Sequence, residues 1–298
     1  MKCLPVIVCP AVTRLLPVAN GSLVVFGGVK KAGKSTVTAN VAEPLVERGS
    51  SVMVISTEEP EDHVRLRVAS LTAGIPFVRC LPTAKVPLTD VEWERITVTV
   101  ERQKPHLQVV GLGNGPVGWT TTPKGIAQIL DAVACRERKL DLIMLDYTKI
   151  EPSRSGQDKR GAILEVMHRL DSFKNECGIP VIVFSQVWSA NSKDDEPFSA
   201  RTKECRSICD LATHTVEIRK DREHQMTLWT RHDWRWDDGR EDKAITKWEE
   251  GRFRDPSPEE LHAYLEAMKA RKGKRKSIDD DLAGALQQEA EGVDGEST

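Results

Sequence analysis

The sequence predicts an α/β fold in which a mostly parallel central sheet lies between two layers of helices. Two observations lead to this prediction. From Gly21 onward, short unbroken apolar runs such as 23–26 and 52–55 alternate with longer helical stretches, and such runs are typical of strands covered on both faces. After about Thr213 the spacing changes to short strand-like segments, which predicts antiparallel hairpins at the end of the sheet.

The predicted elements follow the chain in a regular order. The expected parallel strands are 23–26, 52–55, 107–112, 142–146 and 181–186. A helix is expected over 34–48 and ends at Gly49, a charged one over 60–71, and another begins at the Thr-Pro pair 122–123. Strand–helix alternation of this kind indicates parallel strands joined by helical crossovers.

The composition fits one globular domain with some solvated extra length, because the chain has 298 residues, 39% hydrophobic and 30% charged. The formal net charge of −2 excludes a generally basic surface, so contacts with nucleic acid would come from a local loop or channel. The seven cysteines show no repeated short spacing, which favours free thiols in a reducing compartment over disulfides or a zinc site.

Three parts are expected along the chain: an N-terminal arm over 1–20, a domain over 21–255 and a charged, flexible tail over 256–298, at whose start a short helix could form. The arm contains three prolines and no clear cleavage site, so we do not interpret it as a signal peptide. No apolar run is long enough to cross a bilayer. The expected location is the cytoplasm, or the host cytoplasm for a phage protein.

The strongest motif is GVKKAGKS, from Gly28 to Ser35, which fits G-x-x-x-x-G-K-[ST] with a predicted strand before it and a helix after it. Glycines let this loop wrap phosphates, and backbone N–H groups and the helix N-terminus attract them. Lys34 is expected at the β- and γ-phosphates, Ser35 at Mg²⁺, and Thr36 near the α-phosphate. The expected ligands are ATP and Mg²⁺, bound by Gly28, Val29, Lys30, Lys31, Ala32, Gly33, Lys34, Ser35 and Thr36.

Three further polar residues stand where apolar runs end, and ligands of open α/β sheets bind at the carboxyl ends of the strands. Asp146 is expected to help hold magnesium, although a carboxylate there could also cap a turn. Glu58 is expected to accept a proton from the attacking water, with Glu59 as the alternative, although acids here also favour a helix N-terminus. Gln186 could sense the γ-phosphate or be a sheet-edge amide bonded to backbone.

Six segments of the chain, in order, resemble the ATPase domain of DnaB-type replicative helicases: GGVKKAGKST, VISTEEPEDHVRLRVAS, DVEWERI, LIMLDY, IPVIVFSQVW and KECRSICDLATHTVEI. Those helicases are RecA-fold ring motors that move along single-stranded DNA. The resemblance runs from about Gly21 to Asp255. The Asp-Tyr pair at 146–147 and the Ser-Gln pair at 185–186 carry more of it than the P-loop, which many ATPases share. A RecA-like P-loop three-layer sandwich is therefore expected.

The resemblance also implies roles for individual residues. It makes Glu58 the catalytic glutamate, Asp146 the magnesium aspartate, and Gln186 the link between the γ-phosphate and the DNA-binding loops. It implies an arginine finger that reaches a neighbouring subunit's ATP, for which Arg231 is the first candidate and Arg235 the second. The candidate DNA-binding residues are Lys203, Glu204, Arg206, Arg154, Lys159 and Arg160.

The partners implied are single-stranded DNA, further copies of this chain in a homo-oligomeric ring, as a hexamer, and a primase or loader, with no membrane. Movement in the 5′–3′ direction is inherited from the same family. The family's N-terminal helical domain and linker helix have no counterpart before residue 21, so we expect a stand-alone motor domain of the phage or plasmid kind. Two other hypotheses stay open: a regulatory or recombination ATPase resembling the KaiC or RadA groups, and a nucleotide-switched accessory protein.

Overall fold

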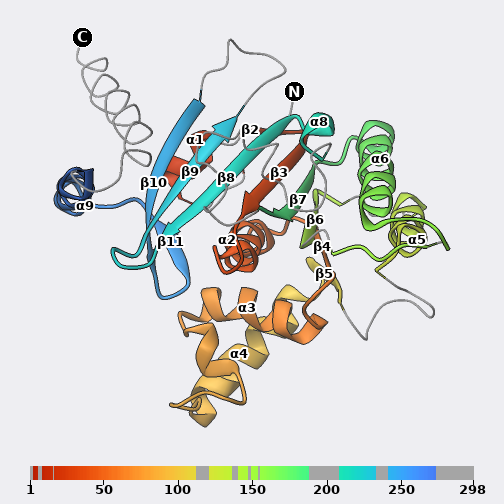
Figure 1. Cartoon of the computed structure of the whole chain (residues 1–298). Coiled ribbons are helices and arrows are strands. Elements are labelled where there is room, and N and C mark those ends of the chain that lie inside the picture. Colours follow the sequence, from red (N-terminus) through yellow and green to blue (C-terminus); the bar gives the residue numbers. More distant parts are fainter. Residues whose placement is uncertain are drawn as a thin grey trace, which may run out of the picture.

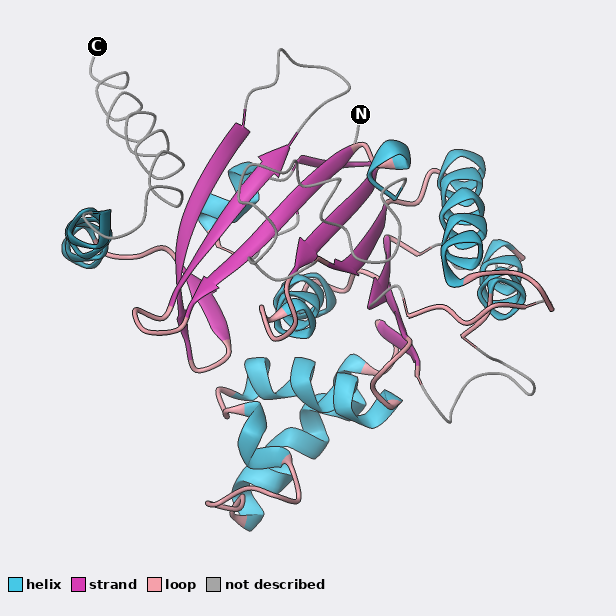
Figure 2. Cartoon of the chain, viewed as in Figure 1, coloured by secondary structure: helices cyan, strands magenta, loops and turns pink. Residues whose placement is uncertain are grey.

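The computed structural model describes residues 3–5, 9–15, 17–111, 121–135, 140–146, 149–153, 155–187, 208–232 and 241–272. In Figures 1 and 2, a twisted sheet runs through the molecule with helices on both of its faces. The predicted α/β three-layer arrangement is therefore confirmed.

The main sheet is mostly parallel. Its strands are β3 (Leu23–Gly28), β4 (Val52–Ser56), β5 (Leu107–Val110), β6 (Leu142–Asp146), β7 (Val181–Gln186), β8 (His214–Asp221), β9 (Met226–His232), β10 (Glu241–Glu249) and β11 (Arg252–Arg254). Within the described residues their order is β11-β10-β9-β8-β3-β7-β6-β4-β5. The strands from β8 to β5 pair in parallel, and β8, β9, β10 and β11 pair antiparallel. Both the parallel strands and the C-terminal hairpins were predicted.

Helices cover both faces of this sheet. On one face, α1 (Pro10–Leu15), α2 (Lys34–Glu47) and α3 (Glu61–Ala73) bury their apolar side chains in one core cluster. On the other, α5 (Pro123–Ala134), α6 (Lys159–Cys177) and α8 (Ile208–Leu211) form a second cluster. The order of layers is thus helix, sheet, helix, and the strands are apolar because both their faces are covered.

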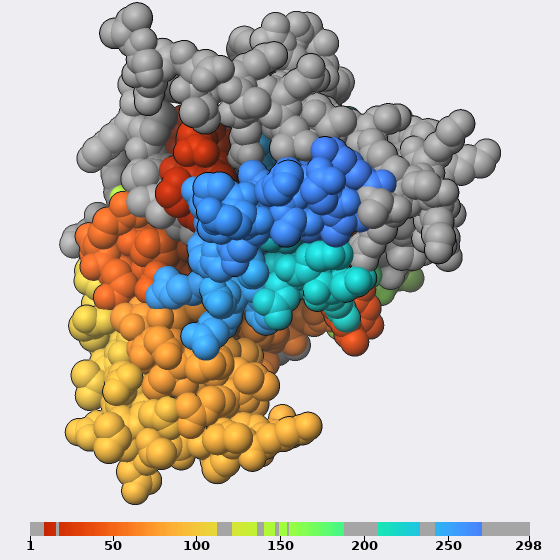
Figure 3. All heavy atoms as spheres, turned by 90° about the vertical axis from the view of Figure 1, so that its left-hand side faces the viewer, coloured from red at the N-terminus to blue at the C-terminus, as the bar shows by residue number. Residues whose placement is uncertain are grey.

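A lobe projects from the first helical layer. It comprises residues 61–104, which include α3, the 3-10 helix η1 (Phe77–Cys80) and α4 (Asp90–Gln103), and we call it the α3–α4 lobe. Its own small core contains Ile75, Cys80, Leu88 and Ile96. In the space-filling view it protrudes in orange and yellow beneath the C-terminal hairpin and α9 (Pro258–Lys272) (Figure 3).

Aromatic side chains join the parallel half of the sheet to the hairpins. The rings of Phe26 and Phe184 stack with centroids 5.3 Å apart, and Trp229 meets Phe26 edge-on at 6.2 Å. Trp229 is fully buried, and its indole N–H donates to the Thr246 hydroxyl at 2.9 Å. Because a buried indole needs a partner for its N–H, this bond fixes β10 against β9.

The expected domain boundaries are too narrow at both ends. α1 places Ala11, Val12 and Leu15 in the main core, and β1 (Cys3–Pro5) pairs with β2 (Pro17–Ala19). The expectation of a flexible tail from residue 256 is wrong for α9, since Tyr264, Leu265 and Met268 pack against β9 and β10. The spacing of these apolar residues places them on one helix face. Residues after 272 lie outside the described part.

The structure also shows the lengths of the helices and the state of the cysteines in the described residues. No described helix combines the length and the apolar character that a bilayer crossing requires. The five cysteines described there, Cys9, Cys80, Cys135, Cys177 and Cys209, are free thiols. Burial raises the pKa of Cys9 to about 12, which keeps this thiol protonated and unreactive.

Gly111 provides a test of close packing after β5. A Cβ at this position would lie 2.5 Å from the Glu61 nitrogen and 2.9 Å from the Glu59 carbonyl oxygen, and backbone atoms cannot move aside cheaply. We expect Gly111→Ala to lower the free energy of unfolding by about 1–3 kcal/mol. Gly161→Ala is the matched control, since a Cβ there first meets the Asp158 carboxylate, at 3.0 Å, and it lies in a helix. Urea unfolding measures both, and equal stability of the two variants would contradict the prediction.

Candidate functional site

The loop between β3 and α2 has the backbone that a phosphate-binding loop requires. Gly33 caps α2 with a φ of 97°, and Lys31 has a φ of 67°, both in the left-handed region that glycine adopts most easily. A Cβ on Gly28 would lie 3.0 Å from the Ala32 Cβ and 3.3 Å from the Ile218 carbonyl oxygen. The loop is therefore tight. The N-terminus of α2 faces the concave side of the loop, and the positive potential of a helix N-terminus favours an anion there.

Lys34 lies folded over this loop. Its Nζ donates to the carbonyl oxygens of Gly28 at 3.1 Å and Val29 at 3.4 Å. The ammonium thus sits at the concave side of the loop, and Ser35 and Thr36 follow it in the first turn of α2. A lysine, two hydroxyls and the backbone N–H groups at one helix end suit a polyphosphate.

Asp146, the last residue of β6, lies beneath α2 and is 7% exposed. The Thr38 hydroxyl donates to its Oδ2 at 3.0 Å. Burial raises the pKa of Asp146 to about 6, the hydroxyls of Thr38 and Ser35 lower it by hydrogen bonding, and the charge of Glu59 raises it. A buried carboxylate beside the Ser35 hydroxyl offers the oxygen ligands that Mg²⁺ prefers. These residues therefore fit a magnesium ion bound with phosphates.

The two glutamates after β4 differ in their surroundings. The Thr57 N–H donates to the Asp146 carbonyl oxygen at 2.9 Å, which ties this segment to β6. Glu58 is exposed. Glu59 is half-buried and accepts two hydrogen bonds from Arg67, at 2.7 and 2.9 Å. Glu59 is thus paired with Arg67, whereas Glu58, the residue before it, is exposed to solvent.

Gln186 ends β7 next to the loop. In the parallel pairing of β3 with β7 it lies opposite Gly28, and the next N–H, of Val187, donates to the Gly28 carbonyl oxygen at 3.2 Å. The hydroxyl of Ser185 is buried, with no hydrogen-bond partner in the described part of the chain. The carboxyl ends of β3, β7, β6 and β4 therefore bring Lys34, Gln186, Asp146 and Glu58 to one edge of the sheet, as the sequence predicted.

A cavity of about 200 Å³ opens beside the first turn of α2, between α3 and the β10–β11 turn. Its walls include Thr36, Ala39, Arg67, Leu71, Phe77 and Trp248. The Arg67 guanidinium lies 4.1 Å from the Phe77 ring centroid, and the Lys220 ammonium lies 3.7 Å from that of Trp248. Mostly apolar walls with flat side chains suit a planar ring, and Thr36 is common to this cavity and the phosphate-binding loop.

The structure places three of the remaining predicted residues elsewhere. Arg231 on β9 forms an ion pair with Asp242 at 2.6 Å and donates to the Leu15 carbonyl oxygen at 3.0 Å, within its own chain. Lys159 and Arg160 open α6, where Lys159 lies 3.4 Å from the Glu151 carboxylate. The other candidates, Lys203, Glu204, Arg206, Arg154 and Arg235, lie outside the described residues.

Sequence reasoning missed Thr38, Arg67 and Trp248. Thr38 follows Ser35 by three residues, so helical spacing alone would have placed both hydroxyls on one face of α2. Arg67 and Trp248 gave no such signal, because they meet at the cavity only through the fold.

A family model described as the DnaB-like helicase C terminal domain matches residues 15–278. Two similar solved structures are an isolated ATPase domain and a DnaB-like replicative helicase, the latter described with its interactions with primase. Each has a TM-score of 0.65 and 14% sequence identity, and each match covers 80% of this chain. The matches cover 86% of the ATPase domain and 58% of the replicative helicase chain. The RadB recombinase has a TM-score of 0.54 and 14% identity over 84% of this chain and 98% of its own. These structures show a RecA-like fold.

One curated relative matches locally. The DNA repair protein RadA of Campylobacter jejuni is 39% identical over 57 residues, which are 19% of this chain and 13% of that protein. This chain thus matches about an eighth of the relative's length.

The substitution Asp146→Asn should raise the stability of the protein and abolish its activity. The pKa of Asp146 is higher in the folded chain than in the unfolded chain. The free energy of unfolding therefore falls as the pH rises from about 4 to about 6, and it stays lowered by the full amount at pH 7. Removing the charge should therefore stabilise the metal-free protein at pH 7 by up to roughly 3 kcal/mol and abolish magnesium-dependent nucleotide hydrolysis. Thermal unfolding at pH 7 and at pH 4 measures the first effect, most of which should be lost at the lower pH. A variant less stable than the parent at pH 7 would contradict it.

Proposed function

Because the chain belongs to the family of DnaB-like helicase C-terminal domains, we propose that it is an ATP-driven DNA helicase motor that couples hydrolysis to movement along single-stranded DNA during replication. Its direction is 5′–3′ and it works in the cytoplasm, or in the host cytoplasm for a phage protein. The observation that supports this most directly is the convergence of Lys34, Asp146, Glu58 and Gln186 at the carboxyl ends of four neighbouring strands.

In this proposal the phosphates of ATP bind the loop from Gly28 to Thr36. Lys34 neutralises the β- and γ-phosphates, and the N–H groups of the first turn of α2 bind their oxygens. Ser35 and Asp146 hold Mg²⁺, which, when bound, draws charge from the same phosphate oxygens. Glu58 orients the attacking water and takes its proton. The nucleoside lies in the cavity beside Thr36, between Phe77 and Trp248.

Gln186 connects hydrolysis to DNA. It lies beside the phosphate-binding loop at the end of β7, so its side chain is the first to change position when the γ-phosphate is lost. The chain that follows β7 carries Lys203, Glu204 and Arg206, which we propose contact the DNA backbone. Lys159 and Arg160 open α6 after β6, and with Arg154 they supply further positive charge.

Self-association is supported by where apolar side chains are exposed. The large ones that are most exposed in the described part all lie on the α3–α4 lobe: Val78, Val86, Val91, Trp93 and Val98. Such confinement favours a surface that another protein covers. We propose that it is covered by a second copy within a homo-oligomeric ring, a hexamer, in which Arg231 exchanges its ion pair with Asp242 for the neighbour's phosphates. A primase or loader is a further proposed partner, in line with the neighbour described with primase.

A regulatory or recombination ATPase of the KaiC or RadA kind is the second candidate, favoured by the local match to RadA. A nucleotide-switched accessory protein is the third. A gel-shift assay separates the first two, because a regulator need not bind a poly-pyrimidine strand.

The main test is ATP hydrolysis with and without single-stranded DNA. We expect hydrolysis to rise several-fold with a poly-pyrimidine oligonucleotide, and a forked duplex with a 5′ tail to be unwound, because DNA contact and turnover share Gln186. Both effects should weaken steeply as salt rises, since they depend on phosphate contacts. A protein that binds ATP but shows neither stimulation nor unwinding would contradict the proposal.

The neighbouring glutamates allow a matched comparison. Glu58→Gln should reduce turnover by about a hundredfold or more while ATP still binds, since Lys34 and Asp146 are untouched. Glu59→Gln removes the ion pair with Arg67 and should reduce turnover far less. Single-turnover hydrolysis and binding of a fluorescent ATP analogue measure the two effects. The reverse order of the two variants would assign the general base to Glu59.

A further inference from the structure

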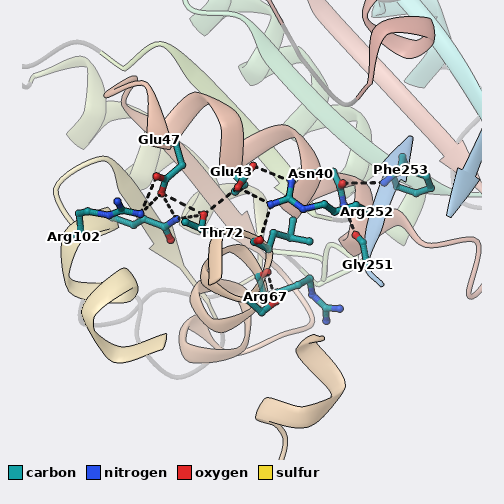
Figure 4. Close-up of polar contacts among 12 residues, drawn as sticks. Asn40, Glu43, Glu47, Arg67, Thr72, Arg102, Gly251, Arg252 and Phe253 are labelled. Atoms are coloured by element: carbon teal, nitrogen blue, oxygen red, sulfur yellow. Dashed lines mark hydrogen bonds and ion pairs between the residues drawn. The ribbon is translucent and has the colours of Figure 1, made fainter. Parts of the chain in front are cut away.

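A polar network on one face of α2 joins the walls of the cavity (Figure 4). Asn40, Glu43 and Glu47 follow one another at helical spacing, so they share a face, and Asn40 and Glu43 are buried. This face is turned away from Asp146 and toward α3, α4 and β11. Buried polar groups must be bonded, and their partners come from these elements.

Arg252 of β11 forms the centre of the network. Its guanidinium lies 2.9 Å from the Glu43 carboxylate and donates to the Leu71 carbonyl oxygen at 2.6 Å. The Thr72 hydroxyl donates to the same carboxylate at 3.1 Å. One arginine therefore links α2, α3 and the hairpin, which are the three elements that surround the cavity.

Asn40 makes a second connection. Its side-chain N–H groups donate to the carbonyl oxygens of Thr36 and Gly251, each at 2.8 Å, and its Oδ1 accepts from the Phe253 N–H at 3.2 Å. Thr36 and Gly251 both line the cavity. A single amide thus fixes the first turn of α2 against the β10–β11 turn.

We propose that Asn40, Glu43 and Arg252 are positioning residues that set the spacing of the cavity walls and thereby the affinity for the nucleoside part of ATP. This rests on the proposed function, in which the phosphates bind the adjacent loop. A cavity whose walls are already fixed binds a flat ring without first ordering those walls, and such preorganisation adds affinity. Asn40 also bonds the Thr36 carbonyl oxygen at the end of the loop, whereas the bonds of Glu43 and Arg252 described above reach no loop residue. Changes at Glu43 and Arg252 should therefore affect the nucleoside alone.

The same helix offers a matched control. One turn further along α2, Glu47 accepts hydrogen bonds from Arg102 at 2.8 and 3.0 Å and from Gln103 at 2.8 Å, both at the end of α4. This ion pair has the same chemistry and lies on the same face. Its side chains bond one another and Thr72, which does not line the cavity, whereas Arg252 bonds the cavity residue Leu71. If these ion pairs only stabilised the fold, loss of Glu43–Arg252 and loss of Glu47–Arg102 would have the same effect on ATP binding.

The experiment measures ATP hydrolysis and its competition by inorganic tripolyphosphate in Arg252→Met, Glu43→Gln and the control Arg102→Met. For the first two variants we expect KM for ATP to rise about tenfold, the factor that corresponds to roughly 1.4 kcal/mol, with kcat little changed. Tripolyphosphate should inhibit all variants and the parent equally, because it uses only the loop. Arg252→Lys should recover part of the affinity, since an ammonium can pair with Glu43 but not bridge to Leu71 as well.

Unchanged KM for ATP in Arg252→Met, or an equal weakening of tripolyphosphate, would overturn the proposal. If thermal unfolding shows that Arg252→Met does not fold, Glu43→Gln decides, because it keeps the shape of the side chain. Failure of the proposed function looks different: the parent would bind neither ATP nor tripolyphosphate, and Lys34→Ala would change nothing.

Discussion

The burial of Asp146 under the N-terminal half of α2 is the constraint on which the rest of the site depends. A carboxylate at the end of a covered parallel strand loses its water, which raises its pKa. The buried carboxylate is tolerated because α2 supplies the hydroxyls of Ser35 and Thr38 and the positive potential of its N-terminus. That contact fixes α2 over the strand ends, and with it the loop and Lys34. The adjoining segment of β4 is bound to β6 by the Thr57 N–H, so Glu58 is placed by the same anchor.

Because α2 is one rigid helix, its two faces cannot move independently. One face carries Ser35 and Thr38 toward Asp146, and another carries Asn40 and Glu43 toward the hairpin and the α3–α4 lobe. The phosphate end, the cavity and the lobe are therefore positioned by a single element of 14 residues. A change at the lobe can be transmitted to the loop through this helix and through Arg67.

Local signals in the sequence predicted the layers, the loop and the strand-end residues, since each depends on a short run of chain. Asp146 and Gln186 could be placed because parallel strands end at one edge. The cavity could not be predicted, because Arg252 lies 209 residues from Glu43 and 181 from Leu71, and only the sheet order brings them together. A short helix was allowed at the start of the tail, but its packing as α9 was not foreseen, because its many charges hid the spacing of Tyr264, Leu265 and Met268. For Arg231, sequence gives the residue type but not the ion pair with Asp242.

Arg67 is a second link, besides Thr36, between the cavity and the residues at the strand ends. Its guanidinium lines the cavity over Phe77, and it also bonds both oxygens of Glu59, the neighbour of Glu58 in the chain. A ligand that stacks on Phe77 in the cavity must therefore share space with the Arg67 guanidinium, which binds Glu59. Movement of the guanidinium would break its two bonds to Glu59. Since Glu59 and Arg67 act in opposite directions on the pKa of Asp146, the same movement would also change the charge balance at Asp146. In the proposed function, one side chain would therefore join recognition of the base to the chemistry at the phosphates.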